Sequence, residues 1–171
     1  MNSNIKANAR DDVVYSNLAY ILPVLFAPTY AAQVILSLTG AALVGGSAVY
    51  HATYTREGQS LDVSTMMTYV ASLTCAVGAQ WTVWAWALLP VAAVGYWAYP
   101  RQTNSYVHVP AWTGIALVML AFQAGCWALP PGVLFIGGGV IKLAQPGRDA
   151  WLHSLWHLLG GLAGAAAMGV L

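Results

Sequence analysis

Charged residues are what this sequence has least of: six Lys and Arg with five Asp and Glu make up 6% of its 171 residues. Soluble domains carry roughly 25%. The net charge of +1 and the lack of a basic run exclude a nucleic-acid partner, which would need clustered Lys and Arg to meet its phosphates. Cysteine is also scarce. Cys75 and Cys126 both fall in apolar runs, so we expect two small buried side chains and no disulfide.

Apolar residues dominate instead, at 59% of the chain. Every charged residue lies in one of four places, namely residues 6–12, 56–62, 101 and 142–149. The uncharged runs between them are long enough for spans of about 20 apolar residues. The sequence therefore predicts a multi-pass integral membrane protein of the all-α class, with a short polar N-terminal tail over residues 1–12 and a single seven-helix domain over residues 13–171.

Prolines, glycines and polar groups divide the apolar runs into helices. Two helices are expected over residues 13–27 and 29–54, before a polar loop at residues 56–59. Residues 63–99 hold two more helices that separate near residues 78–80, and residues 100–105 form a loop. The run 106–141 is expected to break at residues 130–132. Asp149 is then the predicted N-cap of a seventh helix that continues to the end.

The alternation of seven spans places every Lys and Arg on or near the side that holds the N-terminus. Positively charged short loops stay in the cytoplasm. The sequence therefore predicts a cytoplasmic N-terminus.

Two histidines, His153 and His157, are four residues apart at the start of the seventh helix, and so share one face of it. The same alternation places His51, at the end of the second helix, on the same side. Three neutral imidazoles and a water make a tetrahedral zinc site with one open position. We therefore predict that His51, His153 and His157 bind zinc on the cytoplasmic side.

Two further residues complete the predicted site. Asp62, expected to open the third helix, could deprotonate a zinc-bound water, and Ser47, one turn before His51, could hydrogen-bond the water or a substrate oxygen. Taken singly, each residue has an ordinary alternative: an interfacial histidine, a helix N-cap for Asp62, or a small packing residue for Ser47. The fourth histidine, His108, is interpreted as interfacial and not as a ligand.

The motifs carrying these residues resemble those of alkaline ceramidases. The resemblance lies in Ser-x3-His at Ser47 and His51, the Gly-Gln-x-Leu-Asp run that ends at Asp62, and His-x3-His at His153 and His157. The wider superfamily includes the progestin and adiponectin receptors and haemolysin III-type proteins. The resemblance implies a seven-helix fold in which Asp62 is general base and then acid, Ser47 stabilises the oxyanion, and the substrate is ceramide or a related N-acyl lipid.

Calcium fits the sequence less well than zinc. Animal alkaline ceramidases bind calcium through an acidic and aromatic N-terminal stretch, whereas residues 1–17 here offer only Asp11, Asp12 and Asn17. The chain is also shorter than typical members of that family, so the resemblance indicates the metal more firmly than the substrate. The sequence has no signal for oligomeric state.

Two other functions stay open beside the zinc-dependent lipid amidase. One is a receptor-like or regulatory membrane protein of the same superfamily, in which zinc is mainly structural. The other is a transporter or small channel that moves protons through its histidines. A transport path usually carries ionisable residues inside the membrane, and the sequence offers only scattered uncharged groups such as Thr74, Gln80 and Gln123.

Overall fold

The computed structural model describes residues 15–100, 102–144 and 150–171, and these are helical, with no strand among them. The predicted all-α class is therefore confirmed. The elements in chain order are η1 (Asn17–Ile21), α2 (Leu22–Phe26), α3 (Tyr30–Thr53), α4 (Arg56–Gly78), η2 (Val83–Ala87), α5 (Leu88–Ala98), α6 (Gln102–Ala124), η3 (Gly125–Ala128), α7 (Leu129–Ala144) and α8 (Ala150–Gly169).

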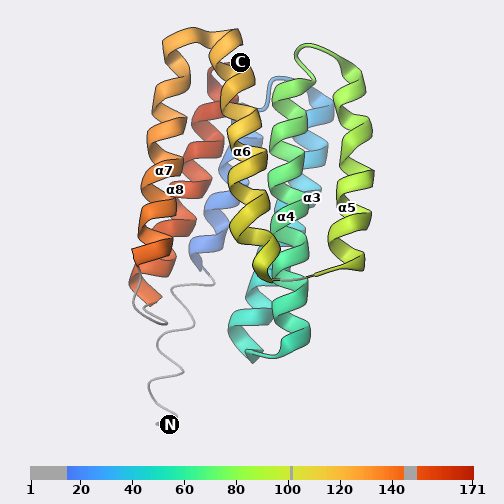
Figure 1. The fold of residues 1–171 in the computed structure, drawn as a ribbon, viewed down its shortest axis with the longest axis vertical. Helices are drawn as coiled ribbons and strands as arrows, with labels where there is room; N and C mark the ends of the chain where they lie inside the picture. Colours follow the sequence, from blue (N-terminus) through green and yellow to red (C-terminus); the bar gives the residue numbers. More distant parts are fainter. Residues whose placement is uncertain (1–14, 101, 145–149) are drawn as a thin grey trace.

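The helices form a bundle in which successive arms run in opposite directions (Figure 1). The described residues form six uninterrupted helical stretches, and the one at residues 102–144 reverses direction at η3, where Gly125 has a φ of +59°. Each short 3₁₀ turn leads into the helix that follows it, so the described part of the chain forms seven helical arms. The ends α3–α4, α5–α6 and α7–α8 lie together at the lower end of Figure 1, and the C-terminus lies at the upper end.

The predicted polar loop at residues 56–59 is wrong, because these residues form the first turn of α4. Thr55 is the N-cap, and its hydroxyl accepts a hydrogen bond from the Gly58 N–H at 3.0 Å. Tyr54, in the left-handed conformation with φ 51°, closes α3 just before it. Polar side chains suit an exposed first turn as well as they suit a loop. As a consequence, Asp62 lies in the second turn of α4 and does not open it.

Two further boundaries differ from the prediction. The helix α6 begins at Gln102, so residues 102–105 belong to it, although they were expected to be loop. The break before α7 falls at Gly125 and not at residues 130–132, because proline is tolerated in the first turn of a helix, where α7 holds Pro130 and Pro131. The expected N-cap Asp149 lies outside the described residues.

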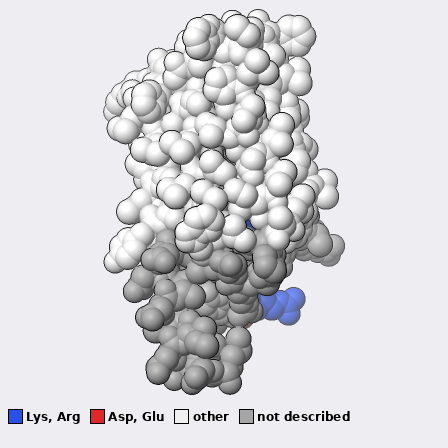
Figure 2. All heavy atoms as spheres, turned by 90° about the vertical axis from the view of Figure 1, so that its left-hand side faces the viewer, with Lys and Arg blue, Asp and Glu red and all other residues white. Residues whose placement is uncertain are grey.

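The bundle buries small polar side chains within its apolar core and exposes many large apolar side chains. The central helix, α4, packs against α3, α5 and α6 and buries Ser64, Thr65, Ser72 and Thr74. Large apolar side chains are exposed on η2 with α5, α6, α7 and α8. The upper part of the face in Figure 2 accordingly shows no Lys, Arg, Asp or Glu. Soluble monomers rarely expose apolar patches larger than a few hundred Å².

Two helical runs are long and apolar enough to cross a membrane, judged by length and composition alone. One is α3, Tyr30–Thr53, and the other is Tyr106–Ala144, which includes the turn at η3. The cysteine prediction is correct for Cys75, which is buried, and wrong for Cys126, which is exposed beside Gly125. Both are free thiols.

The first arm, η1 with α2, is wedged against α3 and α8. A Cβ at Gly160 would lie 3.2 Å from the Tyr20 ring, and one at Gly161 would lie 2.7 Å from the Ala19 Cβ and collide with the Ala19 carbonyl oxygen. On the other side, Gly40 of α3 lies against the Tyr20 carbonyl oxygen. The glycines of α8 therefore allow the close helix packing that a small-residue motif predicts.

We expect Gly161→Ala to destabilise the protein by about 1–3 kcal/mol, because the new methyl group overpacks the contact with Ala19. The matched control is Gly114→Ala in α6, where a Cβ would meet nothing within 4 Å. That change should be neutral or stabilising by up to about 1 kcal/mol. Unfolding of the two variants in detergent measures the difference, and equal stability would contradict the packing.

Candidate metal centre

Three histidines from two helices that are far apart in the sequence meet at one end of the bundle. His51 lies in the last turn of α3, and His153 and His157 lie in the first two turns of α8. One ring nitrogen of each lies within 4.8 Å of the corresponding atoms of the other two. The ring centroids of His153 and His157 are 4.6 Å apart, and those of His51 and His153 are 5.1 Å apart. This group could hold a metal ion.

The hydrogen bonds of the imidazoles fit a metal-binding role. Both ring nitrogens of His51 are buried and have no hydrogen-bond partner, although buried polar groups are normally paired. The Nδ1 of His157 lies 3.0 Å from the Ser16 hydroxyl oxygen, which leaves Nε2 directed elsewhere. Metal-binding histidines usually hold their second ring nitrogen in such a hydrogen bond. Ser16 is 8% exposed, so this contact is shielded from water.

Asp62 and Ser47 lie together beside the histidines. Ser47 is buried one turn before His51, and its side chain donates a hydrogen bond to the Asp62 carboxylate. The carboxylate is half-buried. The Ser47 hydroxyl, which was expected to bind the water or a substrate oxygen, thus bonds to Asp62, the expected general base. An oxyanion role for Ser47 stays a prediction. Of the calcium candidates, Asn17 is fully buried, and Asp11 and Asp12 lie outside the described residues.

Three residues that were not predicted also border the centre. The ring centroid of Tyr20 lies 5.7 Å from that of His157, and the Trp156 ring lies 5.0 Å from His157 and 5.6 Å from His153. The ammonium of Lys142 lies 4.7 Å from the centroid of Trp156. The one feature of the sequence that could have marked Lys142 as functional is that it is a single Lys in an apolar helix. Nothing in the sequence around Tyr20 marks it as a neighbour of α8.

His108 lies apart from the three-histidine group. Its Nδ1 is 3.0 Å from the Tyr96 hydroxyl, which also accepts a hydrogen bond from the Trp112 indole N–H at 2.6 Å. Because the Tyr96 oxygen accepts from Trp112, its own proton can be donated to His108. His108 therefore has a hydrogen-bond partner without a metal.

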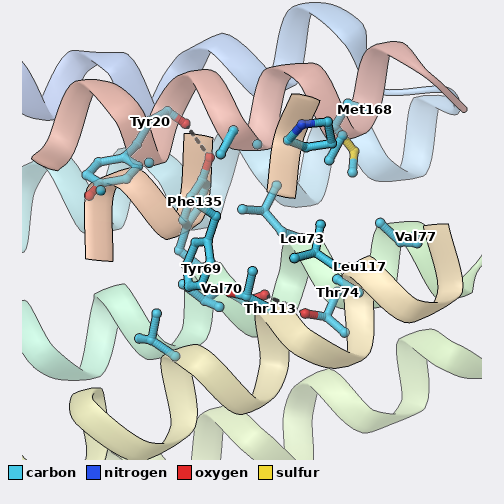
Figure 3. Close-up of a pocket in the computed structure, with 18 of the residues that line it drawn as sticks. Tyr20, Tyr69, Val70, Leu73, Thr74, Val77, Thr113, Leu117, Phe135 and Met168 are labelled. Carbon is cyan, nitrogen blue, oxygen red and sulfur yellow. Dashed lines mark hydrogen bonds between the residues drawn. The ribbon is translucent and has the colours of Figure 1, made fainter. Parts of the chain in front are cut away.

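An apolar cavity begins beside the histidines and extends along the bundle axis (Figure 3). Tyr20 and Trp156, which touch the histidine rings, line one part of it, and Val77 and Met168 line another. Its α4 wall runs from Met66 to Val77, which spans roughly 16 Å at about 1.5 Å per residue. Among its labelled polar groups, the Tyr69 hydroxyl is engaged with the Tyr20 carbonyl oxygen at 2.6 Å.

No known protein family, curated protein or solved structure matches this chain.

We expect His157→Ala and His51→Ala each to remove most of the bound metal, because two imidazoles alone make a poor zinc site. His108→Ala should leave the metal content unchanged, because His108 bonds to Tyr96 instead. Elemental analysis of detergent-purified protein measures this, with about one zinc per chain expected in the unmodified protein. Folded, monodisperse protein without metal would exclude the centre.

Proposed function

We propose that this protein is a zinc-dependent intramembrane hydrolase that cleaves the amide bond of ceramide or a related N-acyl lipid. The observation that carries the proposal is the meeting of His51, His153 and His157 beside an apolar cavity, with both nitrogens of His51 buried and unpartnered. Neutral imidazole suits zinc. The apolar cavity that begins beside the histidines suits part of an acyl chain, and the bundle around both features has an apolar exterior.

The proposal places all seven helical arms in a membrane. Its support is the alternation of the arms, the exposed apolar side chains and the position of the described charged residues. Arg56, Glu57 and Asp62 lie in the first two turns of α4, and Lys142 lies in the last turn of α7. These charges therefore gather at the end of the bundle that holds the histidines. The positive-inside rule then orients the N-terminus and the metal centre toward the cytoplasm.

In the proposed reaction, water adds to the amide carbonyl and the C–N bond breaks to give a carboxylic acid and an amine. A zinc ion held by His51, His153 and His157 would supply a Lewis acid for the carbonyl and would make water easier to deprotonate. Asp62 accepts the proton from that water and then delivers it to the leaving nitrogen. Ser47 holds the Asp62 carboxylate in place through its hydrogen bond. Trp156 and Tyr20 pack against His157, which is buried.

Asp62→Asn should retain zinc and lose turnover by a factor of about 10² or more, because an amide cannot accept the proton from water. The measurement pairs zinc content with hydrolysis of a panel of N-acyl lipids. Full activity in the variant would remove Asp62 from the mechanism. Zinc without turnover of any lipid by the unmodified protein would favour a receptor-like or regulatory role with a mainly structural metal.

Ala167→Leu should shift the chain-length preference toward shorter acyl chains, because Ala167 lines the cavity near Met168 and the larger side chain would fill that part. Ala166→Leu, the neighbouring residue that does not line the cavity, is the matched control. Turnover of N-acyl lipids that differ only in acyl length measures the shift. An unchanged preference in Ala167→Leu would mean that the acyl chain lies elsewhere.

A further inference from the structure

Lys142 is a cation beside the metal centre. It lies half-buried in the last turn of α7, with its ammonium 4.7 Å from the centroid of the Trp156 ring. The same ring packs against His153 and His157. The Trp156 side chain therefore links Lys142 to the histidines by contact.

Two ordinary roles would account for a lysine at this position. Lysine near a helix C-terminus is favoured by the helix dipole, and a lysine near a membrane surface usually extends its ammonium into water. The observed side chain instead lies over Trp156, on the side of α7 that faces α8 and the centre. A cation–π contact compensates only part of the lost hydration of an ammonium.

The charge of Asp62 favours the Lys142 ammonium, but the two side chains do not form an ion pair. Asp62 lies within electrostatic reach, and so do His51 and His153. Among the described side chains, however, no Asp or Glu forms an ion pair with Lys142. The Asp62 carboxylate is already held by Ser47. A half-buried ammonium that forms no ion pair with a described residue is costly in an apolar setting. Ionisable residues in such settings usually serve binding or transport.

We infer that Lys142 is an anion subsite of this centre, and that it binds a carboxylate or phosphate in the headgroup of the acyl lipid. The inference rests on the proposed function and narrows its substrate class from neutral N-acyl lipids such as ceramide to anionic ones. The acyl chain would lie in the apolar cavity that Trp156 lines, and the charged headgroup would lie at Lys142, which contacts the same ring.

A binding experiment tests this subsite without requiring turnover. N-dodecanoylglycine and N-dodecanoylethanolamine share an acyl chain and an amide but differ in the charge of the headgroup. Calorimetric titration into the detergent-purified protein should show about tenfold tighter binding of the glycine conjugate, the effect of one charge-assisted hydrogen bond. Lys142→Met, which keeps the apolar stem, should reduce the preference to about twofold or less, and Lys142→Arg should retain it.

Each outcome decides the inference. Zinc content and binding of the neutral ethanolamide serve as folding controls and should be unchanged in both variants. If Lys142→Met keeps the full preference for the glycine conjugate, the subsite is wrong. If Lys142→Met instead weakens only dodecanoate, measured against dodecanol, then Lys142 binds the released acid and the headgroup assignment is overturned. Because both ligands are scored by binding, absence of hydrolysis would count against the amidase proposal alone.

Discussion

The three-histidine group depends on the close approach of the first helical arm to α3 and α8. Gly160 and Gly161 allow Ala19 and Tyr20 to lie directly against α8, and Gly40 allows the same backbone to approach α3. The arm thereby links two helices that are far apart in the sequence. It also places Ser16 on His157. A methyl group at this contact would shift α8, and with it two of the three histidines.

Small polar side chains in the interior contribute to this arrangement. The interior helix α4 carries Ser and Thr side chains, several of which return hydrogen bonds to carbonyl oxygens one turn earlier, as Thr65 does to Leu61 and Thr68 to Ser64. Small polar side chains allow helices to approach closely. The large apolar side chains lie mainly outside, where a lipid solvent would accept them. The interior is therefore free to hold both a polar centre and an apolar cavity.

Two regions of different polarity meet beside Trp156. The histidines, with Asp62 and Ser47, form a polar group at the end of the bundle, and the cavity beyond Tyr20 and Trp156 is apolar. Trp156 contacts both regions and also Lys142. A single indole thus contacts the apolar cavity, the histidines and the cation.

The sequence by itself determined the helical class, the approximate arms and the pairing of His153 with His157, because grouped charges and a four-residue spacing are local properties of a helix. It also indicated that His51 shares their end, through the alternation of the arms. Boundaries were less certain: polar residues 56–59 suit a first turn as well as a loop, and proline can begin a helix as well as interrupt one. Only the tertiary structure decided that Ser16 and Tyr20 meet α8, that Ser47 holds Asp62, and that Lys142 turns onto Trp156. These contacts join residues far apart in the chain, and they depend on the shape of neighbouring side chains, which no local pattern records.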